Sequence, residues 1–524
     1  MADQAYYVVR AEGVNFSATL EDTEDLSTTR GAGLALLALG DAVKIGLANS
    51  GARNIELLFA GASQAEFWFT ALPGQAEQVR QSILAELRHT GPQREPFPHL
   101  SFVVDVVQDA GDAEKTSAIV EARNRSRQFR EWTIPLPEFR PDALQYDKLD
   151  RMRPGRVRPG WGKDPVSDST AARHEFGRDM RQGFYVSHAG WKAAEGLAFV
   201  DSFEAIVARP PDELPLSPRS GMAVIYADGN GFNSIRGKVG VERFSRELDA
   251  YRGDLLRRVL AWYREGLRGP EGRFAPPVPG PKPPLRFETL MWGGDELMFV
   301  MPSWLAFAFV QGFFAASAPW RIGEGRLTHT AGLVICHYKT PIRQARSLAK
   351  RVVEEIKDKM RDARQAPCNA VGIEIFESLM PPDDDLLDAH RARSFGVSIE
   401  RARSLTLDLA LPGDELGALI ERMCNLSRGE PALLPRSQLY RILRTVKATT
   451  SDLASTDASL RAREEFIEHE RRVRKAGQIV TTSGLRLPRL PGVPARSLAV
   501  ELALVAALWD YASPFADDPL PRFV

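Results

Sequence analysis

The chain has only three cysteines among its 524 residues, Cys336, Cys368 and Cys424, and no two of them form a C-x-x-C pair. This scarcity argues against a disulfide framework and against a zinc site built from cysteines. The chain also lacks net charge, because 68 Lys and Arg balance 68 Asp and Glu. A long-range attraction of the whole molecule to nucleic acid is therefore excluded, although a local basic patch could still supply one.

The sequence also shows no targeting segment and no membrane-spanning segment. The stretch "MADQAYYVVRAEG" has no basic region followed by an apolar one, so we expect no signal peptide and a cytoplasmic protein. The most apolar run, residues 298–318, contains Pro302 and Gln311. We expect it to form a strand end and a buried helix, with no membrane association. A length of 524 residues predicts two to four globular domains.

Two blocks of the sequence alternate strands and helices in the same order. Residues 6–107 read as βαββαβ, the ferredoxin-like arrangement that polymerase palms also use, and a second block with this order opens at residue 222. The stretch "VVRAEGVNF" (8–16) matches "VIYADGNGF" (224–232) at four of nine positions. We therefore predict an α+β fold that contains a duplicated ferredoxin-like palm, of which the first copy is degenerate.

The remaining segments complete a predicted division into four domains. These are the degenerate palm at 1–110, a basic Pro/Gly-rich connector subdomain at 111–219, a catalytic palm at 220–385, and a mainly helical domain at 386–524. Inside the connector, residues 122–182 contain 14 Lys and Arg against nine Asp and Glu and read as an irregular connector or a small subdomain. They could bind RNA or subunits of an RNA-guided complex, although a solvated face is the commoner use of such charge.

Two carboxylates, Asp295 and Glu296, interrupt the apolar run "MWGGDELMFVM". Such groups are almost never fully buried unless they are paired or bind a metal. In a βαββαβ palm the end of the first strand, here Asp228, faces the central hairpin, so the three carboxylates are expected to converge. Their mutual repulsion requires divalent cations, and oxygen ligands favour Mg²⁺ or Mn²⁺. Two such metals can activate a 3′-hydroxyl and stabilise a departing pyrophosphate.

Glycines accompany both acidic positions. Gly293 and Gly294 permit a tight turn and leave room for a ribose or base. After Asp228, the next helix opens with "GNGF", whose backbone amides are expected to cradle a triphosphate; these residues are Gly229, Asn230, Gly231 and Phe232. Either motif alone could be an ordinary turn, and their joint placement favours the functional interpretation.

At this point the residues resemble a known family. "YADGNGF" together with "MWGGDELMFVMP" resembles the palm of the GGDEF nucleotidyl cyclases. It resembles more closely the large palm-polymerase subunit of type III CRISPR effectors, which makes cyclic oligoadenylate from ATP. The stretch "HTAGLVICHYKTPIRQARSLAKRVVEEIKDKM" is similar to the strand, His-Tyr-Lys-x-Pro segment and helix of that subunit. The resemblance covers residues 220–380.

The resemblance assigns roles to particular residues. It implies that Asp228, the carbonyl of Gly229 and Asp295 hold metal. Glu296 takes the second acidic position, where the CRISPR family usually has Asp. Lys357 would contact the triphosphate, with an ordinary exposed helix lysine as the alternative.

Three departures from the family's pattern shape the expected function. Diguanylate cyclases read guanine with an Asn and an Asp, and at that spacing this chain has Arg236 and Ser245, which favours ATP. No His-Asp nuclease domain precedes the palms and the four-cysteine zinc element is absent, which favours a stand-alone or minimal form. In the first copy, Ser63 and Gln64 stand opposite Asp295 and Glu296, so we expect that copy to be catalytically silent.

The resemblance thus implies a metal-dependent nucleotidyltransferase or cyclase that joins ATP, or mixed nucleoside triphosphates, into a cyclic or short oligonucleotide second messenger. The setting would be CRISPR-type or stand-alone antiviral signalling, and a homo-oligomer is one expected state. A second hypothesis is a scaffold subunit of an RNA-guided effector with weak or no synthase activity. A third is a transferase that adds nucleotides to RNA.

Overall fold

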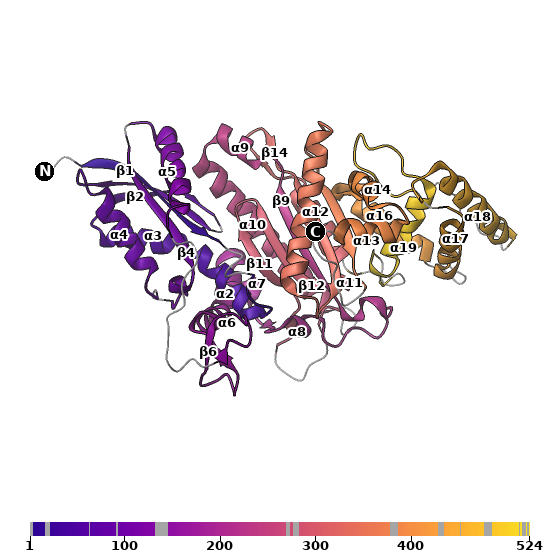
Figure 1. Ribbon diagram of the computed structural model, residues 1–524, viewed down its shortest axis with the longest axis horizontal. Coiled ribbons are helices and arrows are strands. Elements are labelled where there is room, and N and C mark those ends of the chain that lie inside the picture. The colour runs from indigo at the N-terminus through magenta and orange to yellow at the C-terminus, as the bar shows by residue number, and fades with distance from the viewer. Residues whose placement is uncertain are drawn as a thin grey trace. The chain divides into compact units, whose positions relative to one another are not determined.

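The computed structural model describes most of the chain, and the described residues are 4–15, 21–61, 63–90, 93–109, 111–131, 145–268, 273–275, 282–377, 386–427, 434–450, 452–475, 485–512, 514–515, 520 and 523. They form two compact units. The first consists of Met1–Glu195, Asn233–Asp254 and Thr289–Leu297, and the second of Gly196–Phe232, Leu255–Glu288 and Met298–Val524. The first unit contains a four-stranded sheet, and most of a six-stranded sheet belongs to the second (Figure 1).

The first unit contains a four-stranded sheet in the order β2-β3-β1-β4. Its strands are β1 (Ala5–Val14), β2 (Arg53–Ala60), β3 (Gln64–Ala71) and β4 (Ser101–Gln108). The central strand β1 pairs antiparallel with β3 and with β4, so that Tyr7 lies opposite Phe69 on one side and Gln108 on the other. A central strand flanked on both sides is buried along most of its length, as the run of apolar residues in β1 predicts.

Helices cover both faces of this sheet. They are α2 (Leu26–Leu37), α3 (Leu39–Asn49), α4 (Ala76–Leu87) and α5 (Ala113–Gln128). The main core joins α2, α3 and α4 to one face of the sheet. Helix α5 lies on the opposite face (Figure 1). Its Val120 packs against Val8 and Val107. Strand residues alternate between faces, which is why one strand supplies both cores.

The basic connector is more regular than its composition predicts. It contains β5 (Gln145–Tyr146), β6 (Pro154–Val157), β7 (Pro165–Val166) and the 22-residue helix α6 (Asp168–Ala189). The alternative of an irregular connector was therefore wrong for 122–128, which belong to α5, and for 168–182. Helix α6 crosses α2 so closely that a Cβ on Gly31 would lie 1.8 Å from the carbonyl oxygen of Arg173. Residues 132–144 of the basic segment lie outside the described residues.

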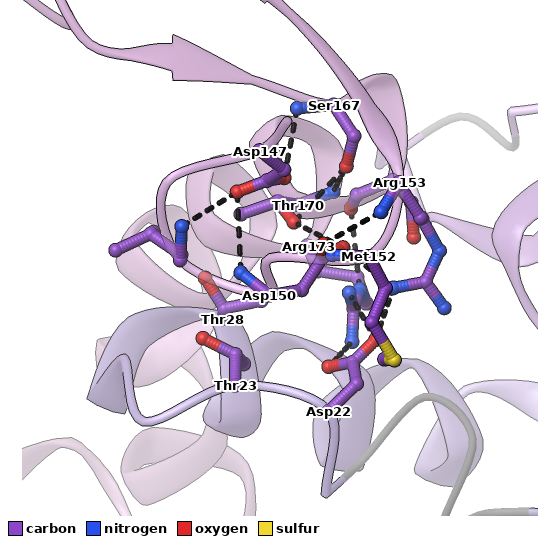
Figure 2. A network of polar contacts seen from close by, with 12 residues as sticks. Asp22, Thr23, Thr28, Asp147, Asp150, Met152, Arg153, Ser167, Thr170 and Arg173 are labelled. Atoms are coloured by element: carbon purple, nitrogen blue, oxygen red, sulfur yellow. Dashed lines mark hydrogen bonds and ion pairs between the residues drawn. The ribbon is translucent and has the colours of Figure 1, made fainter. Parts of the chain in front are cut away.

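A buried polar network ties this connector to the first unit (Figure 2). The Asp147 carboxylate accepts hydrogen bonds from the backbone amides of Leu149 and Ser167, at 2.7 and 2.8 Å. The fully buried Arg173 donates two bonds of 2.9 Å to Asp22, whose carboxylate also accepts from Arg153. Charges of both signs can be buried here because each has partners. Much of the connector's charge is thus structural.

The second sheet has six strands in the order β11-β12-β9-β15-β16-β17. The strands are β9 (Gly221–Gly229), β11 (Glu288–Gly293), β12 (Glu296–Pro302), β15 (His329–His337), β16 (Ala370–Ile375) and β17 (Leu411–Pro412). Strand β15 pairs antiparallel with β9 and parallel with β16. The two units divide this sheet. Residues Thr289–Leu297, which include most of β11 and the hairpin turn, belong to the first unit, and Met298–Pro302 of β12 belongs to the second.

Helices α11 (Ser303–Ser317) and α12 (Ile342–Asp362) pack on this sheet. A Cβ on Gly332 would lie 2.2 Å from the carbonyl oxygen of Ala349 on α12, so the helix can approach β15 only because that position is glycine. On the same face of the sheet, Lys350 of α12 lies over the ring of Tyr226, 5.8 Å from its centroid. Asp228 is two residues further along β9 and therefore points to the face that α12 covers.

Shorter elements and helices complete the structure. Those that come between α6 and β15 in the sequence are α7 (Trp191–Ala194), β8 (Ala198–Phe199), α8 (Phe203–Val207), α9 (Phe232–Val239), α10 (Val241–Gly266), β10 (Pro284–Leu285), β13 (Arg321–Ile322) and β14 (Gly325–Arg326). The C-terminal helices are α13 (Leu386–Phe395), α14 (Ile399–Ser404), α15 (Thr406–Leu409), α16 (Leu416–Ser427), α17 (Arg436–Thr449), α18 (Thr456–Lys475) and α19 (Leu498–Ala512). The C-terminal segment is mainly helical as predicted, but it also supplies the edge strand β17.

The predicted mixed α+β class is confirmed, and the elements of both sheets follow one another in the predicted order. That both blocks are polymerase palms stays a prediction, as do the four domain boundaries. In the described part of the chain, no single helix is long and apolar enough to cross a membrane. One bent pair, α2 with α3, meets the length and composition test jointly across a 45° break.

Candidate functional site

The first predicted acidic residue, Asp228, lies at the end of the buried strand β9. Every residue from Met222 to Ala227 is buried, whereas Asp228 is only half-buried. In the pairing with β15, Asp228 lies opposite Thr330 and Gly229 lies opposite His329. The strand therefore carries the charge to the rim of the sheet, where it can reach a ligand without being buried in the core.

Lys357 of α12 binds this end of the strand. Its Nζ lies 2.6 Å from Oδ2 of Asp228 and donates a 2.7 Å hydrogen bond to the carbonyl oxygen of Gly229. Both side chains are about a quarter exposed, 25% for Lys357 and 22% for Asp228. The structure thus brings three predicted site residues together, and it contradicts the interpretation of Lys357 as an ordinary exposed helix lysine.

Asn230, predicted to bind nucleotide, is occupied by internal bonds. Its side-chain amide donates to the carbonyl oxygen of Cys368 at 2.9 Å, and its Oδ1 accepts from the Thr330 hydroxyl at 2.9 Å. Its backbone amide donates to the carbonyl of Thr328 at 2.8 Å. Asn230 therefore fixes the loop that follows Asp228, and neither group remains for a phosphate in this arrangement.

Gly229 and Gly231, on either side of Asn230, are glycine for different physical reasons. A Cβ on Gly229 would meet the ring of Phe232 at 2.6 Å, so glycine is needed for the packing of this turn. Gly231 has a φ of +68°, which L-residues adopt rarely, and a Cβ there would meet nothing within 4 Å. The space beside Gly231 is consistent with the predicted approach of a ligand to the helix that begins at Phe232.

Behind this loop lies His329, which the sequence analysis did not single out. Its ring contacts three buried aromatic rings, those of Phe232, Phe313 and Trp320. Burial, with a smaller contribution from the charge of Lys357, lowers the pKa of His329 to about 3. The neutral ring therefore serves as packing under Gly229, and only its position at the start of β15 could have indicated this.

A further polar chain supports the same strand. The His329 amide donates to Oδ1 of Asn369 at 2.9 Å, and the Asn369 side chain donates to Asp414 at 2.7 Å. Asn369 precedes β16, and Asp414 follows the edge strand β17. These two residues were missed because their partners lie 40 and 45 residues away, and no local pattern marks such a pairing.

The second acidic pair stands in the turn between β11 and β12. The turn residues are Gly294, with a φ of +56°, and Asp295, while Gly293 ends one strand and Glu296 begins the next. Asp295 and Glu296 are half-buried, so the apolar run does not bury them in the core. The positive φ is one that glycine adopts more readily than other residues, which agrees with a glycine at 294.

Within the first unit, Arg252 of α10 holds this turn. Its guanidinium donates a 3.0 Å hydrogen bond to the carbonyl of Gly294 and lies 5.8 Å from the centroid of the Trp292 ring. The Trp292 ring in turn contacts Phe184 and His188 of α6. Burial, and next the charge of Arg252, lower the pKa of His188 to about 4. Sequence reasoning missed Arg252, because an arginine in a charged helix carries no distinguishing signal.

The relative position of the two acidic groups stays a prediction. Asp228 belongs to the second compact unit and Asp295 to the first. Within the described residues, no group of three or more His, Cys, Asp or Glu side chains is placed to hold a metal. The oxygens of Asp228 and Gly229 nevertheless both face one cation, the Lys357 ammonium. Carboxylate and carbonyl oxygens fit Mg²⁺ or Mn²⁺, so this half of the predicted site suits such an ion.

In the first sheet, the residue that the sequence match aligns with Asp228 is Glu12, and its charged neighbours differ. Glu12 is buried near the end of β1, and it lies opposite Gln64 of β3 and Val103 of β4. Its carboxylate is 2.9 Å from Arg125 of α5 and 3.6 Å from the buried Arg10. Glu12 thus lies near two arginines, of which Arg10 also pairs with Glu66 at 3.1 Å.

Comparisons with known proteins place this geometry on a known fold. No family model and no curated protein matches the chain. Solved structures do. In the crystal structure of an apo Csm1–Csm4 cassette, the match covers 97% of this chain and 70% of the matched chain, with a TM-score of 0.50 and 12% sequence identity. A cassette in complex with cA3 matches 97% and 70%, with a TM-score of 0.50 and 11% identity. Csm1 in T. onnurineus matches 96% and 70%, with a TM-score of 0.50 and 14% identity.

The likeness is one of fold. At 11 to 14% identity it says nothing about which side chains the proteins share. It agrees with the resemblance to the large subunit of type III CRISPR effectors at the level of the chain's architecture. This chain spans about 70% of the length of these Csm1-type chains.

Proposed function

We propose that this chain is a metal-dependent nucleotidyltransferase or cyclase that joins ATP, or mixed nucleoside triphosphates, into a cyclic or short oligonucleotide second messenger for antiviral signalling. The observation that carries the proposal is the arrangement at the end of β9. There the oxygens of Asp228 and of the Gly229 carbonyl together bind one positive charge, the Lys357 ammonium. Strand β9 is the sheet neighbour of β12, which follows the turn with Asp295 and Glu296. The fold likeness to a Csm1–Csm4 cassette in complex with cA3 supports the nucleotide class.

Each group has a role that its surroundings support. Asp228, the Gly229 carbonyl, Asp295 and Glu296 would hold Mg²⁺ or Mn²⁺, whose oxygen preference they meet. When bound, the metal pair supplies activation of a 3′-hydroxyl and neutralises charge on the departing pyrophosphate. The open space at Gly231 accommodates the triphosphate.

Two supporting contacts fix the acidic groups in place. Asn230 holds the loop that follows Asp228, through the carbonyl of Cys368 and the hydroxyl of Thr330. Arg252 holds the Gly294 carbonyl, beside Asp295. Rigid support of this kind favours a site in which reacting groups are positioned before substrate arrives.

The test is synthesis by the purified full chain with each nucleoside triphosphate and Mg²⁺ or Mn²⁺, with products identified by mass. Asp228→Asn and Asp295→Asn should each reduce synthesis about a thousandfold, because a ligand lost from a metal site costs several kcal/mol of transition-state stabilisation. Asp358→Asn is the matched control, since Asp358 is an exposed carboxylate next to Lys357 and should leave synthesis unchanged. Synthesis at the wild-type rate in either site variant would rule out the assignment.

A second candidate is a scaffold subunit with weak or no synthase activity. It is favoured by the fold likeness to proteins crystallised as two-component Csm1–Csm4 cassettes. Co-purification of the chain with RNA or with a second protein, together with no product from any nucleotide, would support it. Efficient product formation that depends on Asp228 would exclude it.

A further inference from the structure

The position of Lys357 raises a question about metal binding. Its Nζ contacts the two oxygens that the proposed site assigns to a metal, Asp228 Oδ2 at 2.6 Å and the Gly229 carbonyl at 2.7 Å. A Mg²⁺ ion would require the same oxygens at about 2.1 Å. An ammonium group and a divalent cation cannot occupy that position together, because they overlap in space and repel each other.

A lysine side chain can leave its position more easily than a rigid cationic group can. Its ammonium is a compact point charge on a flexible four-carbon stem, so it can rotate away without moving the helix. Lys357 is 25% exposed, which leaves a route toward solvent or toward a bound ligand. The nearest anion in the proposed reaction is the triphosphate, to which the resemblance already assigns this residue.

The first unit shows the same arrangement with a different cation. There the acidic residue is Glu12, and the cation is Arg125 on α5, the helix that follows the fourth strand of its sheet as α12 follows β15. The second arginine, Arg10, lies 3.6 Å from the same carboxylate. Glu12 therefore meets arginines, whereas the cation at Asp228 is a lysine, whose flexible stem allows it to be displaced.

We propose that Lys357 is a placeholder cation, which holds Asp228 and the Gly229 carbonyl in place before metal binds and moves to the triphosphate of the nucleotide when Mg²⁺ or Mn²⁺ takes those oxygens. The two cations therefore compete when nucleotide is absent, and they cooperate when it is present. This inference rests on the proposed function. It makes Lys357 a positioning residue in the empty site and a phosphate-binding residue in the loaded one.

Binding of Mn²⁺ to the full chain without nucleotide, followed by electron paramagnetic resonance of the free ion, tests the competition. Lys357→Met should bind Mn²⁺ about tenfold or more tightly than wild type, because a competing charge is gone. Lys357→Gln, a second neutral variant, should behave in the same way. Lys359→Met is the matched control, because Lys359 is exposed on the same helix, and its Mn²⁺ affinity should be that of wild type. Asp228→Asn should lose the tight site.

A non-hydrolysable ATP analogue should reverse this order. With the analogue present, wild type should bind Mn²⁺ more tightly than Lys357→Met, since only wild type has the second phosphate contact. Equal or weaker Mn²⁺ affinity of both neutral variants without nucleotide, in folded protein judged by circular dichroism, would overturn the placeholder role while the metal site stands. Failure of wild type to bind Mn²⁺ with or without the analogue would instead overturn the proposed function.

Discussion

Glu12 and Arg125 form an ion pair of 2.9 Å in the first unit, as Asp228 and Lys357 do at 2.6 Å in the second. In both cases an acidic residue near the end of the first strand meets a cation from the helix that follows the fourth strand. The correspondence extends the sequence repeat from a nine-residue match to a tertiary contact. It agrees with the predicted duplication of one fold, which stays a prediction.

Glu12→Gln should leave the rate of synthesis within about tenfold of wild type, because this copy has Ser63 and Gln64 where the other has carboxylates. Stability should fall by about 1–3 kcal/mol, since Arg10 loses a buried partner while the half-exposed Arg125 is solvated. Product formation and chemical denaturation measure the two effects. Abolished synthesis in folded Glu12→Gln protein would show instead that the first copy is a working site.

Asn230→Ala should slow synthesis by about tenfold or more, because the loop after Asp228 loses its bonds to Cys368 and Thr330. The unfolding free energy should fall by about 1–3 kcal/mol, as expected for buried groups left without partners. The matched pair at the neighbouring position is Thr330→Ser, which keeps the hydroxyl, and Thr330→Val, which removes it. Only the valine variant should lose activity. An equal loss of stability in Asn230→Ala with a full synthesis rate would contradict the positioning role.

ATP should be used in preference to GTP. Diguanylate cyclases recognise guanine with an Asn and an Asp at positions that correspond to Arg236 and Ser245. In the structure the Arg236 guanidinium lies 5.7 Å from the centroid of the Phe59 ring, so its charge is directed toward an aromatic side chain of the same unit. Incubation with equal amounts of the two nucleotides and mass analysis of the products measures the preference. Efficient synthesis from GTP with ATP left unused would reverse this conclusion.

The local elements of the active region could be predicted from the sequence because they follow local patterns. The buried helix expected within 298–318 is observed at Ser303–Ser317, and the helix expected after the His-Tyr-Lys-x-Pro segment is observed at Ile342–Asp362. Glycines in a turn are equally local, and Gly294 has the positive φ that the motif implied.

Contacts between distant polar side chains could not be predicted. Helix α6 was missed because it is rich in charge, and its buried Arg173 finds a partner in Asp22, 151 residues away. Asn369 and Asp414 were missed for the same reason, and so were both partners of Lys357, the Asp228 carboxylate and the Gly229 carbonyl. A hydrophobic period shows which face of a helix is buried, but it does not show which buried charge meets which.

The stability of the first unit should depend on pH through His188, which packs on Trp292 beneath the turn that carries Asp295. Burial, then the charge of Arg252, lower its pKa to about 4 from an ordinary value of 6.5. The folded state therefore binds this proton less readily than the unfolded state does. The stability contributed by neutral His188 is complete above pH 6.5 and is lost as the pH falls toward 4. The loss between pH 7 and pH 5 should be about 2 kcal/mol.

His188→Leu isolates this effect, because the other seven histidines titrate in both proteins and cancel in the difference. Unfolding by urea at pH 7 and at pH 5 should show that wild type loses about 2 kcal/mol more than the leucine variant. Since His188 supports Trp292, and the Gly294 carbonyl is held by Arg252 beside that ring, synthesis by wild type should also fall before global unfolding as the pH is lowered. Parallel losses of stability in the two proteins would mean that His188 takes up its proton in the folded state as readily as in water.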